Sequence, residues 1–438
     1  MNTPESAPVP RPWFDRFLRG VARLGLAAAL TFLLTLAVIS VSPFIATALE
    51  TLISPESKLP QFAGILVLIV LVVAPISLLW LAHRKRWGES WPGLAAGYLI
   101  LAPVFVWLAW DEPAVRYPVS LDELCPAGPQ AAESWTVTLA YTARNGQPAP
   151  RTYVAPKFTW GGAAPDKPVE WQAYLEKNRD LIHATWKDLP ERTWLAELNA
   201  FPAIGDLMPA SPSGPLIKFQ PLRTVSQIGC AEAGLLALEG KGDEAMDTLL
   251  PILEVGRKLE PTARSLVRFM LARVVQKLSL NTARFIVDHA AVSPDRKARL
   301  AAVLQGGSGG PAGARRMLFI EYAVTSHFFL NDFSDAAHER PPWKRGLLVL
   351  FRLVYNPVAT VNLQGEYTKE LAELAERREL AGFGTRAEAF VSRNSRPHFK
   401  NLVGRLLISM ATPAYGRVLD TYWKIEDLRT ALAADVAK

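Results

Sequence analysis

Cysteine is scarce in this sequence: its 438 residues include two, Cys125 and Cys230. That number excludes a disulfide-dense scaffold and a zinc site built from cysteine alone. Disulfides persist in oxidising compartments, so pairing of the two thiols depends on where the chain is located. Cys125–Cys230 is therefore a candidate disulfide. The alternative is two unpaired thiols, with Cys230 a small buried helix residue.

Histidine is also scarce, and none of the six residues has the HExxH spacing of helical zinc proteases. A phosphate-binding loop is missing, because no Gly-Lys-Ser/Thr follows the glycine-rich stretch 306–310. That stretch spells G-x-S-x-G around Ser308, but a predicted helix precedes it where hydrolases with this motif have a strand. We interpret 306–310 as a flexible break within a helical domain, and we predict no cofactor and no metal site.

Dense basic runs interleaved with aromatic residues are absent, although the formal net charge is +7. Most Lys and Arg residues lie near Asp and Glu in the sequence, a pattern typical of a solvated surface of mixed charge. The sequence therefore gives no indication of nucleic acid as a partner.

Charged side chains are missing from three apolar stretches, Leu24–Ile45, Phe62–Ala82 and Trp91–Trp110. Each has about the 20 residues that a helix needs to cross a bilayer. We predict that residues 24–110 form a three-helix transmembrane anchor after a basic head, residues 1–23. Transporters and proton relays usually need an ionisable group at membrane depth, so these spans favour an anchor.

The basic residues that flank the spans predict their orientation. Four Lys or Arg precede the first span, one follows it, three follow the second and one follows the third. Because positive charge concentrates on the cytoplasmic side, the N-terminus is predicted to be cytoplasmic and the chain after Trp110 extracytoplasmic. That side is the periplasm if the cell has two membranes. One alternative is a cleaved signal peptide that ends near Ala46–Ala48, which leaves the remaining topology unchanged. Another is buried helices of a soluble domain, which the flanking tryptophans disfavour.

The chain after the membrane begins with a proline-containing linker, residues 111–134, and continues as a domain over residues 135–438. Residues 135–142 alternate in polarity, Asn145-Gly146 is a turn signal, and 151–154 contain β-branched residues. Together these features predict a small β-hairpin near the start of the domain.

The rest of the domain has helical periodicity and no strand signal. Predicted helices are 167–189, 191–199, several within 222–304, then 311–332, 342–355, 360–380, 397–411 and 413 to the end. In the helix after Pro261, the residues Leu266, Phe269, Met270, Val274 and Leu278 form the predicted apolar side. We therefore expect a mainly α protein with a bundle-like or solenoid-like soluble domain.

Residues 233–253 resemble the middle of a tetratricopeptide repeat. Ala233, Gly240, Ala245 and Leu249 occupy spacings that this motif uses. The resemblance covers about one repeat, and no second copy occurs at a period near 34 residues. It predicts the packing of a helix–turn–helix and implies no further function.

One polar cluster is a candidate catalytic site. Carboxylates and imidazoles close in sequence can bind a metal or transfer protons. The cluster consists of Glu321, His327, Asp332, Asp335, His338 and Glu339. The alternative, which we favour, is a solvated polar face at a helix end.

These features favour a membrane-anchored, extracytoplasmic helical scaffold or protein-binding module of the cell envelope. Its expected partners are the lipid bilayer and another protein. One alternative is a membrane-tethered hydrolase that uses the cluster between Glu321 and Glu339. A second is an accessory subunit of a larger membrane complex.

Overall fold

The computed structural model describes residues 107–108, 110–140, 142, 165–208, 220–306, 309–332, 355–395, 400–411 and 415–437. Within these ranges the chain is helical and contains no strand, which confirms the predicted mainly α class. No helix found there combines the length and the apolar content that a bilayer crossing requires. The predicted spans lie almost entirely outside these ranges, so they stay a prediction.

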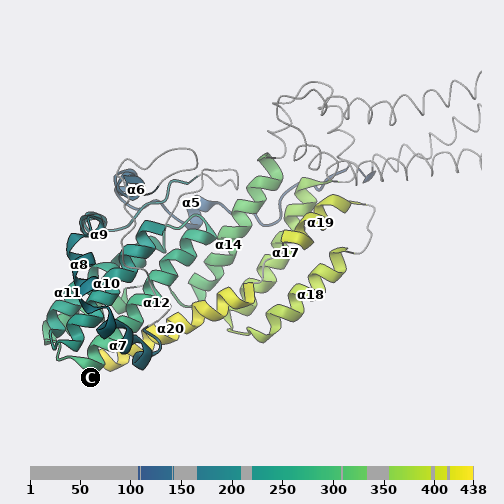
Figure 1. Ribbon diagram of the computed structural model, residues 1–438. Helices are drawn as coiled ribbons and strands as arrows, with labels where there is room; N and C mark the ends of the chain where they lie inside the picture. The colour runs from purple at the N-terminus through teal and green to yellow at the C-terminus, as the bar shows by residue number, and fades with distance from the viewer. Residues whose placement is uncertain are drawn as a thin grey trace, which may run out of the picture. The chain divides into compact units, whose positions relative to one another are not determined.

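The chain divides into two compact units. One comprises residues 1–113, 334–360 and 397–406, and the other comprises 114–333, 361–396 and 407–438. The helices, with the numbering of Figure 1, are α5 (Leu121–Leu124), α6 (Ala131–Ala140), α7 (Pro168–Lys177), α8 (Arg179–Asp188), α9 (Glu191–Asn199), α10 (Gln220–Leu238), α11 (Gly242–Leu259), α12 (Leu266–His289), α13 (Pro294–Gln305), α14 (Pro311–His327), a π-helical turn (Phe328–Asp332), α17 (Pro357–Glu376), α18 (Ala381–Ser395), α19 (Leu402–Ala411) and α20 (Tyr415–Val436).

Helix α6 replaces the first strand of the predicted β-hairpin, and that prediction was wrong. Ser134, Trp135, Thr138 and Thr142 are buried, which is the spacing of one helix face and not of a strand. The Thr138 hydroxyl donates to the Ser134 carbonyl, 2.9 Å away, so a β-branched residue is accommodated within the helix. The expected turn and second strand lie outside the described residues.

The helix predicted over 167–189 is interrupted at Asn178. Its backbone leaves the helical region, with φ −111° and ψ 16°, and its side-chain amide donates to the Tyr174 carbonyl at 2.8 Å. Asparagine favours such local hydrogen bonds, which compete with helix continuation. The short helix predicted over 191–199 is confirmed as α9.

Helices α10, α11 and α12 lie side by side and contain most of the hydrophobic core (Figure 1). The turn between α10 and α11 contains Gly240 with φ +77°, a conformation that glycine adopts without strain. Ala233, Ala245 and Leu249 are fully buried. The helix–turn–helix expected from the repeat-like spacing is therefore confirmed.

Helix α12 buries a different face from the predicted one. Of the five apolar residues expected on the buried side, Phe269 is buried, and Val274 is exposed. The buried side instead includes Arg268, Arg273 and Gln276. Polar residues occupy this side because ion pairs and hydrogen bonds satisfy them, so hydrophobicity alone could not mark the face that packs.

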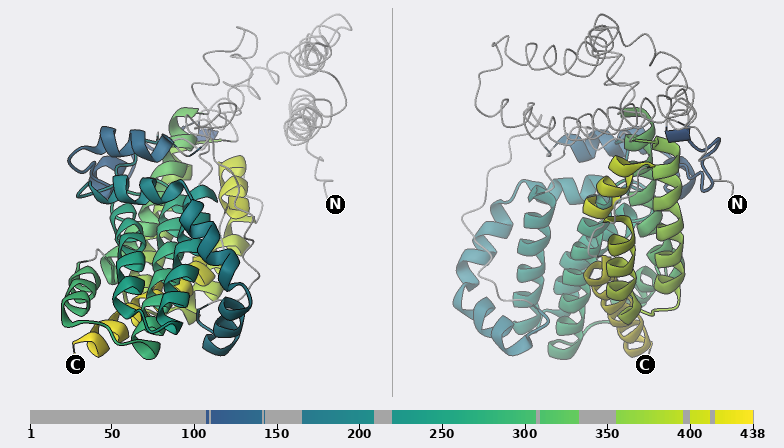
Figure 2. Two further views of the ribbon diagram at one scale, coloured as in Figure 1. Left: turned by 60° about the vertical axis from the view of Figure 1, so that its left-hand side comes forward. Right: turned by 90° about the vertical axis from the view of Figure 1, so that its right-hand side faces the viewer.

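The C-terminal half follows the predicted series of helices closely. Helix α14 with its π-helical turn covers the predicted 311–332 helix, whereas the helix expected at 342–355 lies almost entirely outside the described residues. Helix α18 was not predicted. Helix α20, the yellow helix that ends at the C-terminus in Figure 2, packs against α12 and α13.

In the unit that contains residues 107–113, three distant segments are joined by hydrogen bonds. The Asp111 carboxylate accepts from the backbone N–H groups of Val358 and Ala359, each at 2.9 Å, and so caps the start of α17. The Asn356 side chain donates to the Leu108 carbonyl at 3.2 Å, and its backbone N–H donates to the Asn401 side chain at 2.9 Å. The residues after Trp107 are thereby fixed to the starts of α17 and α19.

Candidate functional site

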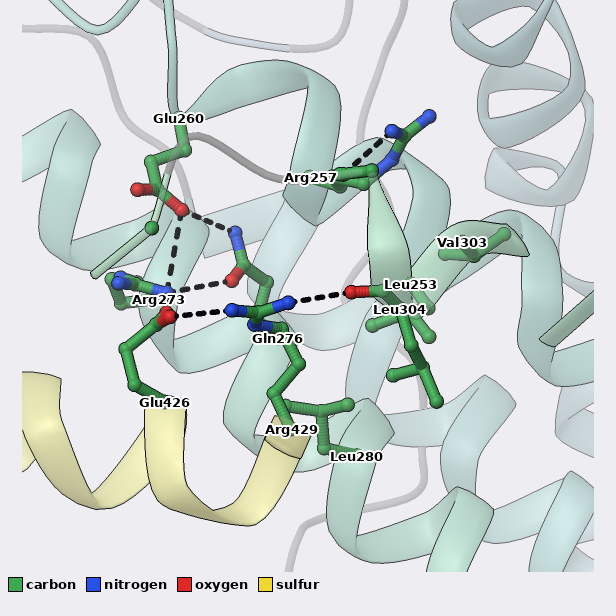
Figure 3. Close-up of a pocket in the computed structure, with 12 residues that line it drawn as sticks. Leu253, Arg257, Glu260, Arg273, Gln276, Leu280, Val303, Leu304, Glu426 and Arg429 are labelled. Carbon is green, nitrogen blue, oxygen red and sulfur yellow. Dashed lines mark hydrogen bonds and ion pairs between the residues drawn. The ribbon is translucent and has the colours of Figure 1, made fainter. Parts of the chain in front are cut away.

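The most extensive buried polar cluster surrounds Arg273 on α12 (Figure 3). Its guanidinium lies 2.6 Å from the Glu426 carboxylate on α20 and 3.4 Å from that of Glu260, next to the end of α11. Gln276 accepts from Arg273 at 3.0 Å and donates to Glu260 at 2.8 Å. Three separate helical segments therefore meet through charged groups that are nearly inaccessible to solvent.

Glu426 extends this network to the glycine-rich stretch. Its carboxylate accepts from the Gly310 backbone N–H at 3.1 Å and from Arg429 at 2.9 Å. The Tyr422 hydroxyl donates to the Gly310 carbonyl at 2.8 Å. Arg257 donates to the Gly306 carbonyl at 2.6 Å. Gly306 and Gly310 of the predicted flexible break are therefore held by hydrogen bonds, and Ser308 lies outside the described residues.

Aromatic rings cover the charged core of the cluster. The Arg273 guanidinium lies 3.9 Å from the ring centroid of Tyr422, close enough for a cation–π interaction. Burial is the largest effect on the Glu426 pKa and raises it, but the charges and hydrogen bonds of Arg273 and Arg429 outweigh burial, so the pKa is lowered overall. Glu426 is therefore ionised at neutral pH and poorly suited to donate a proton.

The cavity beside this cluster has a volume of about 20 Å³, lined in part by Arg257, Gly309 and Leu280. That volume holds roughly one water molecule and no organic substrate. Because the carboxylates of Glu260 and Glu426 are ion-paired with arginines, the cluster connects helices and is not an acid–base pair. No sequence motif marked it, since Arg273 and Glu426 are 153 residues apart.

A second buried ion pair fixes the start of α12. Arg268 and Asp206 lie 3.5 Å apart, and both side chains are inaccessible to solvent. Arg268 also donates to the Gly205 carbonyl at 2.7 Å and lies 5.0 Å from the Trp135 ring centroid. The pair attaches the loop after α9 and helix α6 to α12, so its role is structural.

A third polar cluster connects α8 to α10 and lies closer to the surface. His183 Nδ1 lies 2.9 and 2.8 Å from the two carboxylate oxygens of Glu232, and its Nε2 lies 3.2 Å from Glu239. Glu239 also pairs with Arg179 and Lys241, each at 2.9 Å. Burial lowers the His183 pKa, but the hydrogen bonds and charges of the two glutamates outweigh burial and raise it.

The polar cluster predicted from the sequence is described only in part. Glu321 and His327 lie on α14, where six residues of separation put them roughly 120° apart around the helix. The pKa of Glu321 is raised by burial, and its charge acts on the buried Tyr415 of α20. Asp332 ends the π-helical turn. Its side chain, with Asp335, His338 and Glu339, lies outside the described residues, so the catalytic role of the cluster stays a hypothesis from the sequence.

The disulfide considered between Cys125 and Cys230 is not formed, and both residues are free buried thiols. Cys125 donates to the Ala263 carbonyl at 2.9 Å, whereas Cys230 lies 3.9 Å from the Ser279 hydroxyl, inside the packing of α10 against α12. The two thiols therefore contact different residues and not each other. Burial raises the pKa of Cys125 to about 11 and that of Cys230 to about 12.

Across the described ranges, no group of three or more His, Cys, Asp or Glu side chains is arranged to hold a metal ion. No protein family model matches the chain, and neither a curated protein nor a solved structure matches it.

Proposed function

We propose that this protein is a membrane-anchored helical scaffold whose extracytoplasmic domain binds a helix of another protein. The observation that carries the proposal is an apolar surface on α12. Val267 and Val274 are 66% and 42% exposed, although α12 contributes other side chains to the hydrophobic core. Met270, Leu271 and Leu278 are half-buried beside them, and Leu271 and Leu278 each pack against the core on one side. These five residues are called the α12 outer face.

The spacing within the α12 outer face fits a helical partner. Val267, Leu271, Val274 and Leu278 are separated by four, three and four residues, the repeat with which one helix packs along another. An amphipathic helix that binds such a face contributes apolar residues at the same spacing. The face is thus suited to the apolar side of one partner helix.

The polar chemistry of the domain also favours binding over catalysis. The carboxylates of the largest buried cluster are ion-paired with arginines, and its cavity has room for about one water molecule. Its charged groups therefore contribute to a rigid helical body. A rigid body that presents an apolar helix face is what a scaffold requires.

The location in the proposal comes from the sequence. The three uncharged stretches and the alternation of flanking Lys and Arg support a multi-pass membrane protein with a cytoplasmic N-terminus. The helical domain is then extracytoplasmic. If the protein is instead an accessory subunit of a membrane complex, it has the same anchor. Its partner then contacts the membrane spans and not the α12 outer face.

Site-specific photo-crosslinking in native membranes tests the proposal. A photoreactive amino acid at Val274 should give one discrete adduct with a second protein. The matched control is the same amino acid at Val169 on α7, an isolated valine that is 83% exposed. Adducts at neither position, or the same adducts at both, contradict the proposed role of the α12 outer face. Mass spectrometry of the adduct identifies the partner.

A further inference from the structure

The unit that contains residues 107–113 presents large side chains to solvent at the end of the third apolar stretch. Trp107 and Trp110 are 54% and 66% exposed. They are three residues apart and close the stretch that begins at Trp91. Tryptophan concentrates at the boundary between hydrocarbon and water, because its ring is apolar and its N–H is polar.

The fold brings a distant basic residue to this point. Lys400 Nζ lies 5.5 Å from the ring centroid of Trp107, although the two residues are nearly three hundred positions apart. Asn401, the next residue, accepts the hydrogen bond from the Asn356 N–H, and Asn356 in turn donates to Leu108. Backbone and side-chain hydrogen bonds therefore fix Lys400 beside the end of the apolar stretch.

Helix α19 starts two residues after Lys400 and is apolar in sequence, yet several of its residues are incompletely buried. Leu406 is 50% exposed, and Leu402, one turn earlier, is half-buried. A helix start with one exposed and one half-buried leucine next to a lysine has the composition of an interfacial segment, in which apolar groups enter the membrane and ammonium groups reach the phosphates.

We propose that Trp107, Trp110, Lys400 and Leu406 form a membrane-contact collar that lies in the headgroup layer of a phospholipid bilayer. The inference depends on the proposed membrane anchor, and it adds that a segment near residue 400 also contacts the lipid. One sequence prediction and one structural contact favour lipid as the occupant. The predicted span ends at Trp110, and the one cation held against Trp107 in the described contacts matches the negative charge of phospholipid phosphates.

The collar has a structural consequence for the domain. Asp111 caps α17, and Asn356 joins the starts of α17 and α19 to Leu108. The helix starts are therefore attached directly to the point where the chain leaves the membrane. The collar fixes these starts at the bilayer surface and does not act as a loose tether.

Fluorescence quenching on the full chain in vesicles of phosphatidylcholine and phosphatidylglycerol tests the collar. An environment-sensitive fluorophore is attached to Leu406→Cys, and to Val169→Cys as the exposed control. The native cysteines are buried, so the introduced thiol is labelled selectively. The label at position 406 should be quenched by nitroxide-bearing lipids and protected from aqueous iodide, with the reverse at position 169. Iodide quenching at 406 that equals that at 169 overturns the collar.

A charge variant separates the contribution of Lys400. Lys400→Glu should reduce lipid quenching at position 406, because the negative carboxylate repels the anionic headgroups. Lys400→Arg keeps the positive charge and should preserve the quenching. Unchanged lipid quenching in Lys400→Glu overturns the role of this lysine. Flotation of the vesicles distinguishes the two levels of the proposal. A chain that does not float with them contradicts the anchor, and a floating chain with an aqueous label at 406 contradicts the collar alone.

Discussion

Arg273 and Glu426, which lie 153 residues apart in the sequence, form a 2.6 Å ion pair in the interior of the helical domain. The pair connects α12, in the middle of the core, to the C-terminal helix α20. Removing one partner of a buried ion pair leaves the other charge without compensation, which is far more costly than losing a surface pair. The contribution of α20 to stability should therefore depend strongly on this contact.

Glu426→Ala should lower the free energy of unfolding by about 3–5 kcal/mol, because it leaves Arg273 and Arg429 without their shared carboxylate. The matched control is Asp427→Ala, the next residue, whose exposed pair with Arg378 should contribute less than about 1 kcal/mol. Denaturant unfolding of the detergent-solubilised chain, followed by circular dichroism, measures both. Similar losses in the two variants would show that the buried pair has no special role.

The His183 contacts predict a stability contribution that depends on pH. Because the folded pKa is raised above the unfolded value near 6.5, the contribution is complete below about pH 6.5 and is lost as the pH rises through the folded pKa. Deprotonation removes the positive charge that His183 places beside the nearly buried Glu232. The pKa of Lys241 is raised by its hydrogen bond to Glu239, so Lys241 stays charged over this range.

Thermal unfolding of the wild type and His183→Gln at several pH values measures this effect. The wild type should be more stable than the variant at pH 6, and the difference should shrink toward pH 8. The contacts of Glu239 with Arg179 and Lys241 are present in both proteins, so they cancel in the comparison. A difference that does not change with pH would disprove protonation of His183 as its source.

Glu191 at the start of α9 is fully buried, and its carboxylate has no hydrogen-bonding partner on another described residue. Burial raises its pKa, so its contribution to stability is complete below about pH 4.3 and is lost as the pH rises through the folded pKa. Glu191→Gln removes the ionisable group and should stabilise the protein at pH 7 but not at pH 4. Equal effects of the substitution at both pH values would contradict this explanation.

The two thiols should be chemically inert in the folded protein. Burial raises their pKa to about 11 and about 12, so the reactive thiolate is scarce at pH 8. Neither sample is treated with a reducing agent. The folded protein should incorporate no maleimide, and the denatured protein should incorporate two per chain. Failure of the denatured, unreduced chain to react would indicate a disulfide and contradict the free thiols.

Local patterns in the sequence predicted most helices but not the contacts between them. Helix α9 was predicted with the correct bounds because Pro190 separates it from the preceding helix and its period is clear. Residues 135–142 were assigned to a strand because β-branched residues alternate there. Packing of α6 against α9 decides otherwise, and Trp194 donates to the Val137 carbonyl at 3.0 Å.

The candidate site could not be predicted for a related reason. Arg273 and Gln276 occupy the buried side of α12, where a hydrophobicity pattern expects apolar residues. Nothing in the sequence distinguishes their partners Glu260 and Glu426 from other glutamates, because only tertiary packing brings them to Arg273. The exposure of Val274 could not be predicted for the same reason. The sequence shows that this residue is apolar, but tertiary packing decides which side of α12 faces solvent.

We propose that the helical domain is anchored in a membrane, with its C-terminus on the extracytoplasmic side. Reporter fusions test it most directly, with a reporter that is active only after export placed after Lys438 or near Trp87. The positive-inside pattern predicts activity after Lys438 and none near Trp87. The reverse pattern, or activity at neither site together with a chain that remains soluble after cell lysis, would contradict the proposed topology.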